Sequence, residues 1–226
     1  MARRQQSRGV CNYCEKEMTK GGLTRHLKTC ASRQQAIEQS TSKKSQNIYH
    51  LQVQDAYGGE FWLHLEMSGT STLDDLDNYL RAIWLECCGH MSEFSVGGAF
   101  SRNTVGMNSQ MNRTFDIGEQ VTHVYDFGDT SETQIKCVDV RQGGPLTQYP
   151  ITLMVRNNMP TPPRKECSQI ATHLCFECVH EYGENGLLCD KHTDSHPHEN
   201  YDRPRVLVNS PRLGYCAYTG PADPPY

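Results

Sequence analysis

The sequence predicts an α+β fold, with a central antiparallel-sheet roll and one main helix, flanked by two small zinc-stapled modules. Strand-like segments surround a single amphipathic helix in the middle of the chain, and C-x-x-C pairs beside histidines lie near both ends. The charge also changes sharply along the chain. We therefore expect a basic zinc finger at 1–30, a linker at 31–46, an α+β domain at 47–160, and a Cys/His zinc module with its tail at 161–226.

Composition excludes several classes of protein. Only 36% of the 226 residues are hydrophobic, and no run approaches the ~18 apolar residues of a membrane span. The segment Met1–Gln6 has no apolar stretch, so we expect no secretory signal and a cytoplasmic location. The eleven cysteines are an odd number, and four of them form two C-x-x-C pairs with histidines nearby, which favours metal ligation over disulfides.

Charge separates a basic arm from an acidic body. Residues 1–46 hold ten Lys/Arg and three Asp/Glu, whereas residues 47–140 hold four and fourteen. The resulting net charges are +7 and -10. This difference in charge indicates what each segment can bind and does not predict the fold. The arm could contact nucleic acid, and the body could recruit a basic protein.

The first metal motif lies in the basic arm and has the spacing Cys11-x2-Cys14-x11-His26-x3-Cys30. A knuckle followed by a helical i, i+4 pair supplies the tetrahedral ligands that zinc prefers. The segment resembles a zinc finger of the Cys-Cys-His-Cys class. Gly22 falls at a helix position that DNA-reading fingers use for base contacts, and it has no side chain to offer. Phosphates could still be bound without sequence preference by the basic side chains of Lys16, Lys20, Arg25 and Lys28.

The segment after the finger, 31–46, is polar and reads as a linker or a frayed helix. Alternation then predicts strands at 48–53 and 61–65 around a turn at 57–60. The apolar spacing over 73–84 predicts a helix, capped by Ser71 or Thr72 and ended by Gly89.

Further strands are predicted at 91–96, 121–127, 133–140 and 149–155, with a polar loop over 97–113. Asp126 and Asp129 straddle a turn and could bind a cation or a basic partner. A solvated turn with Phe127 buried is the more frequent arrangement. Cys87 and Cys88 are most simply core residues.

The C-terminal segment carries a second set of metal ligands: Cys167, Cys175, Cys178, Cys189, His192, His196 and His198. Two arrangements fit the spacing. A ribbon would place Cys175, Cys178, Cys189 and His192 around one zinc. A cross-braced module would pair Cys175 and Cys178 with His196 and His198, leaving Cys167, Cys189 and His192 for a second site. His173 or a water could complete that second site.

Three motifs of the central domain resemble the plasmid Ri-type open-reading-frame-3-like family, which includes passenger proteins of insertion elements. They are the helix entry at 72–76, Glu93–Gly98, and Tyr125–Asp129 with Glu132 and Ile135. The family usually has Trp and His where this chain has Thr130 and Thr133. The segment 208–220 resembles the tail of longer members. The resemblance implies a mobile-element or defence context and no agreed biochemical activity.

The sites predicted here are structural, because catalytic zinc usually keeps an open position beside a carboxylate base. No metalloprotease or deaminase pattern occurs in the sequence. We therefore expect a zinc-binding adaptor that is not an enzyme and that contacts nucleic acid, or a nucleic-acid-bound partner, through the finger. A pure protein-interaction module is one alternative. A metalloenzyme using Cys167, Cys189 and His192 is the other.

Overall fold

The structure is a computed structural model that describes residues 6–40, 45–84, 86, 88–160, 167, 169–198, 200–201, 203–213 and 220–226. Cys87, the boundary after Pro160 and residues 214–219 of the tail lie outside these ranges. Cys88, predicted to be a core residue, is exposed. No helix in the described part of the chain is long and apolar enough to cross a membrane.

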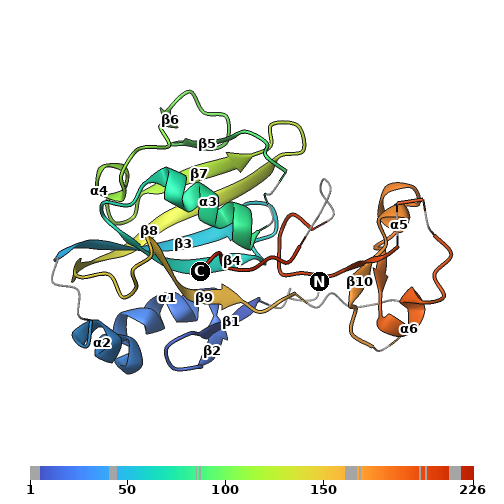
Figure 1. Cartoon of the computed structure of the whole chain (residues 1–226), viewed down its shortest axis with the longest axis horizontal. Helices are drawn as coiled ribbons and strands as arrows, with labels where there is room; N and C mark the ends of the chain where they lie inside the picture. The colour runs from blue at the N-terminus through green and yellow to red at the C-terminus, as the bar shows by residue number, and fades with distance from the viewer. Residues whose placement is uncertain are drawn as a thin grey trace.

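The predicted α+β class is confirmed. A large antiparallel sheet contains nine of the described strands: β1 Arg8–Cys11, β2 Glu17–Thr19, β3 Gln46–Asp55, β4 Trp62–Ser68, β5 Ser92–Ser95, β6 Thr104–Val105, β7 Gln120–Tyr125, β8 Ser131–Gly143 and β9 Ile151–Asn157. Their order is β2-β1-β9-β4-β3-β8-β7-β5-β6. The strands of the finger therefore extend the central sheet, because β1 pairs with β9 (Figure 1).

Helix α3, Leu73–Ile83, packs on one face of this sheet. Thr72 caps it: its hydroxyl accepts from the Asp75 amide, and the Asp75 carboxylate accepts from the Thr72 amide. The apolar side of α3 packs with alternate residues of β3 and β4, such as Leu51 and Leu65, in the main core. The predicted helix was thus correctly placed.

The same helix ends well before Gly89, which was predicted to terminate it. Its last carbonyls have partners from distant segments: Arg156 donates to Ile83 O at 3.0 Å and Ser210 donates to Trp84 O at 2.7 Å. Because these tertiary hydrogen bonds satisfy the end of the helix, a further turn is not needed.

Helices α1, Lys20–Thr29, and α2, Ala31–Glu38, belong to the N-terminal segment. The first half of the predicted linker is therefore helical. Thr24 of α1 donates to Gln52 of β3 at 3.2 Å, and Arg33 of α2 donates to Glu66 of β4. Since successive side chains of a strand point to opposite faces, α1 and α2 cover the face of the sheet opposite to α3.

The predicted polar loop over 97–113 holds two short elements, β6 and α4, Met111–Thr114. Met111 is fully buried in the main core. Its amide donates to Ser71 O, and Thr72 forms a β-bridge with Gln110. A single apolar residue in a polar stretch gave no periodic signal for this contact.

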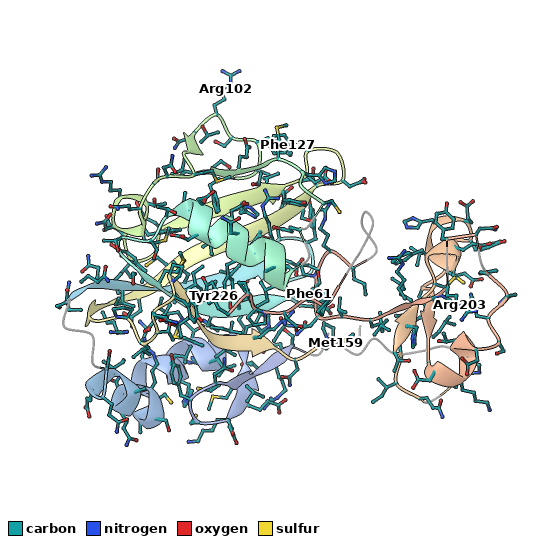
Figure 2. All side chains as sticks on the ribbon, in the orientation of Figure 1. Phe61, Arg102, Phe127, Met159, Arg203 and Tyr226 are labelled. Carbon is teal, nitrogen blue, oxygen red and sulfur yellow. The ribbon has the colours of Figure 1, made fainter. Side chains whose placement is uncertain are left out.

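The prediction that Phe127 is buried in the turn after β7 was wrong. Phe127 is 43% exposed and lies on the surface, whereas Asp126 is 6% exposed (Figure 2). The backbone causes this exchange, since Asp126 has a φ of 62° and its carboxylate accepts from the Gly128 amide.

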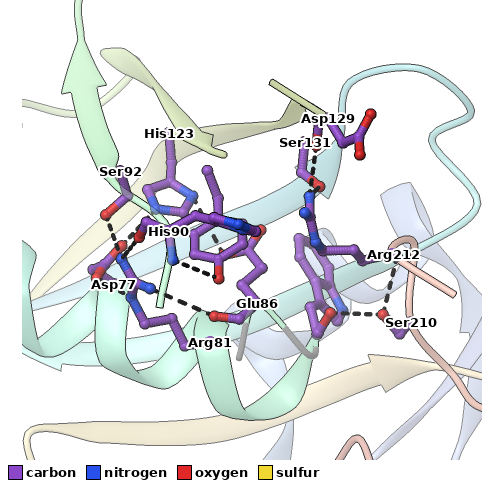
Figure 3. Close-up of polar contacts among 12 residues, drawn as sticks. Asp77, Arg81, Glu86, His90, Ser92, His123, Asp129, Ser131, Ser210 and Arg212 are labelled. Carbon is purple, nitrogen blue, oxygen red and sulfur yellow. Dashed lines mark hydrogen bonds and ion pairs between the residues drawn. The ribbon is translucent and has the colours of Figure 1, made fainter. Parts of the chain in front are cut away.

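The buried Asp126 holds the C-terminal tail. Arg212 is 1% exposed, and its guanidinium donates to Asp126 Oδ2 at 2.6 Å. The guanidinium donates further to Ser131 Oγ at 2.7 Å (Figure 3). It also stacks on the Tyr125 ring, 4.7 Å from the centroid. This charge-assisted contact returns the chain to the central domain after the C-terminal module.

That module is a three-stranded sheet with two short helices. Its elements are β10 His173–Leu174, α5 Phe176–His180, β11 Leu187–Leu188, α6 Asp190–Thr193 and β12 Arg205–Val206. The strand order is β11-β10-β12, and its small core contains two cysteines and Leu188. Such a core is too small to support the module alone, which points to the Cys/His clusters as its main cross-links.

Candidate metal centres

The finger residues predicted as ligands come together in the structure. Cys11 and Cys14 lie at the turn between β1 and β2, His26 lies on α1, and Cys30 lies between α1 and α2. Their ligand atoms all lie within 4.8 Å of one another, and Cys14 Sγ is 3.2 Å from His26 Nε2. Thr19 caps α1 by accepting from the Gly22 amide, which fixes the start of the helix that carries His26.

The second cluster contains Cys175, Cys178, His196 and His198. Cys178 Sγ is 3.4 Å from His196 Nε2 and 3.2 Å from His198 Nδ1, and the two imidazole nitrogens are 3.2 Å apart. Tyr182 stacks on the His198 ring at 4.8 Å with an interplanar angle of 14°. The cysteines flank the start of α5, which positions both sulfur atoms.

The third cluster contains Cys167, Cys189 and His192. The two sulfur atoms are 3.9 Å apart, and His192 Nδ1 lies 3.8 Å from Cys167 Sγ and 3.3 Å from Cys189 Sγ. The structure thus groups the C-terminal ligands as in the cross-braced arrangement and not as in the ribbon. His173, a predicted fourth ligand, instead directs Nδ1 at Thr172 Oγ1 and Asp190.

These distances fit a tetrahedral metal. With Zn–S of about 2.3 Å and Zn–N of about 2.0 Å, neighbouring ligand atoms of a tetrahedron are about 3.3 to 3.8 Å apart. The observed separations run from 3.2 Å to 3.9 Å. Ordinary core packing does not require thiols and imidazole nitrogens to converge in this way. All three clusters could therefore hold a metal ion.

Burial opposes the charged form of the sulfur ligands. It raises the pKa of Cys11 to about 11 and the pKa of Cys178 to about 12. It also lowers the pKa of His26, which keeps that imidazole neutral and able to act as a ligand. A divalent cation would supply the positive charge that these buried thiolates lack.

The four basic residues predicted to bind phosphate divide into two pairs. Lys16 and Arg25 are exposed. Lys20 is half-buried and donates to Gln54, and Lys28 lies 3.6 Å from Asp139 and donates to Val138 O. Burial lowers the pKa of Lys20. Two of the four side chains therefore contact the central domain of the same chain.

A polar layer that the sequence pattern does not indicate lies beneath the finger. Glu66 accepts from Arg33 of α2 and from Arg141 of β8, which binds both carboxylate oxygens at 2.9 Å. Burial alone would raise the pKa of Glu66, but the hydrogen bonds and charges of the two guanidinium groups hold it below its ordinary value. Polar residues that alternate along a strand usually face solvent, so the pattern could not reveal this contact.

Beside this ion pair, His50 Nε2 and His64 Nδ1 are 2.9 Å apart. Both imidazoles are buried, and the other nitrogen of each, His50 Nδ1 and His64 Nε2, has no hydrogen-bond partner among the residues that the structure describes. Burial lowers the pKa of both, that of His64 to about 4.

Comparisons with known proteins place few limits on function. No protein-family model matches the chain, and no curated protein matches it. Among solved structures, a protein of unknown function from Methanosarcina mazei Go1 is similar at 19% identity and a TM-score of 0.40. The similarity covers 47% of this chain and 67% of that protein.

Proposed function

We propose that the protein is a zinc-stabilised, non-enzymatic adaptor that binds another protein. The observation that supports this function most directly is the position of the finger. Its helix α1 lies on the central sheet with Lys20 on Gln54 and Lys28 on Asp139, so part of its basic surface is already used. The finger then acts as a structural part of a larger binding domain.

Zinc is the metal that the donor sets favour. Sulfur and imidazole ligands in tetrahedral spacing select zinc over magnesium or calcium, which prefer oxygen. The clusters of the described chain contain cysteines and histidines and no carboxylate. Metal-dependent hydrolysis usually places a carboxylate base at the metal, so this donor set favours a structural role for the metal.

Contact with nucleic acid is a second candidate function, supported by the exposed Lys16 and Arg25. Two phosphate contacts would give weak binding that falls with salt. The acidic central domain would oppose it. A mobile-element or defence context, implied by the family resemblance, remains part of this proposal.

The test is recovery of partners by the intact, zinc-loaded chain from cells of its source, with and without nuclease treatment. We expect a protein partner that survives nuclease and that rebinds, once purified, at a fixed ratio. Lys16→Gln with Arg25→Gln should leave this complex unchanged. Two results would contradict the proposal and favour the nucleic-acid function. One is loss of the partner after nuclease treatment. The other is a double variant that binds both the protein partner and duplex DNA more weakly, to the same extent.

A further inference from the structure

The face of the sheet that carries the finger is only partly covered. Helix α1 covers the β3 and β4 part, where Thr24 contacts Gln52 and Lys20 contacts Gln54. Gln54 Nε2 in turn donates to Gln134 Oε1 of β8 at 2.9 Å. A continuous row of amides therefore runs from beneath the finger toward β7.

Beyond Gln134 the row opens into a hollow of about 380 Å³. Its lining comes from β7, β8 and the loop after β5: Gly97, Gly98, Gln120, Thr122, Glu132 and Gln134. Gly97 and Gly98 have φ values of 93° and 112°, which side chains rarely adopt, so this wall stays bare. Thr122 is 5% exposed and lines the hollow, so a ligand bound there could form a hydrogen bond with its hydroxyl.

Two carboxylates lie beside the hollow. Glu93 and Glu132 both lie opposite Val124 in the strand register, on the same face as Thr122. Neither side chain has a cationic partner in the described part of the chain; the Glu132 carboxylate accepts from the Tyr57 hydroxyl at 2.8 Å. The buried carboxylates Glu66 and Asp126, in contrast, each bind an arginine.

Two exposed aromatic rings stand at the same end of the domain. Phe100 and Phe127 are 54% and 43% exposed, and their rings meet edge to face at 5.7 Å. Phe100 follows the bare Gly97–Gly98 wall, and Phe127 lies in the turn between the strands that form the floor (Figure 2). A pair of exposed phenyl rings beside unpaired carboxylates suits a cationic side chain with an apolar stem.

We propose that this hollow binds an extended segment of a partner protein in which arginine or lysine alternates with apolar residues. The basic helix of the finger already covers the adjoining half of the same polar face, and the partner segment would cover the remaining half. The partner's cations would pair with Glu93 and Glu132, and its apolar side chains would cover the two phenyl rings. This inference rests on the proposed adaptor function and specifies the partner's chemistry.

A fluorescent peptide that alternates arginine and leucine is the probe, with the same peptide carrying glutamate for arginine as its control. Binding to the full zinc-loaded chain is measured by anisotropy. We expect saturable binding of the arginine peptide only, with amide shifts at Gly97 and Gly98 in NMR spectra. Glu132→Gln and Phe127→Ala should each weaken it about threefold, as expected for one exposed ion pair or cation–π contact.

Glu38→Gln at the exposed end of α2 and Val206→Ala on the C-terminal module are matched controls that should bind normally. Equal binding of both peptides, or equal binding of wild type and both hollow variants, would overturn the proposal. So would amide shifts confined to another surface. A purified natural partner that still rebinds in either case would leave the adaptor function standing, so the two failures are distinguishable.

Discussion

The His50–His64 pair predicts that the folded state loses stability as the pH falls. His64 is buried beneath α1 among Trp62, His50 and the cationic Lys20, and burial lowers its pKa to about 4. The unfolded chain has an ordinary histidine pKa near 6.5. Between these two values the unfolded state binds a proton that the folded state does not, so stability is lost as the pH falls through this window.

The magnitude follows from the two pKa values. Above about pH 6.5 the contribution of His64 is constant, and near pH 5.5 protonation of the unfolded chain has removed about 1.4 kcal/mol. The loss approaches about 3 kcal/mol near pH 4, below which the folded state is also protonated and no further loss occurs. His50 is coupled to His64 through the hydrogen bond at 2.9 Å, so the measured steps belong to the pair.

His64→Gln keeps a polar partner for His50 and removes the titration of residue 64. Urea unfolding of the zinc-loaded wild type and variant should be followed from about pH 7.5 to about pH 5. Protonation of the metal ligands affects both proteins and cancels in the difference between them, which reports the titration lost from the His50–His64 pair. We expect the difference in unfolding free energy to change by about 1.4 kcal/mol by about pH 5.5. Parallel stability curves would refute the reasoning.

Three further predictions concern the metal centres, the tail and the main helix. Cys14→Ser should remove about one zinc per chain and lower the melting temperature of the central domain, because β1 pairs with β9. Cys178→Ser should remove zinc without that effect; identical melting curves for the two variants would contradict this difference. Arg212→Met should destabilise the fold by about 3 kcal/mol in urea unfolding by leaving Asp126 buried without its guanidinium, and adding Asp126→Asn should recover part of the loss. Thr72→Ala should cost about 1 kcal/mol through the capping box, and an unchanged urea midpoint would show that the cap is dispensable.

Local patterns were sufficient to predict much of the fold. The period of apolar residues located α3, and the polar residue before it located its cap, because both signals depend on neighbours within one turn. The same holds for the metal ligands. C-x-x-C pairs and histidines at helical spacing form their geometry locally, so the sequence predicted the residues that the structure brings together.

Contacts between distant segments could not be predicted in this way. The burial of Asp126 depends on Arg212, which lies far along the chain, and the early end of α3 depends on Arg156 and Ser210. Whether the C-terminal ligands form a ribbon or a cross-brace likewise depends on which ligands Cys189 lies beside. All of these contacts join residues that are far apart in the sequence, and hydrophobic periodicity gives no information about such contacts.

The polar layer beneath the finger connects these observations. A zinc finger that reads DNA exposes its helix, whereas α1 here contacts the sheet through Thr24 and the next helix, α2, is held on it by the buried Arg33–Glu66 ion pair. Breaking such a buried ion pair leaves an uncompensated charge, so undocking the finger is costly and its docked position is well defined. The finger therefore determines which part of the sheet is closed. In the proposal made above, the hollow over β7 and β8 is the adjoining part of the same face, which a partner's basic segment would cover.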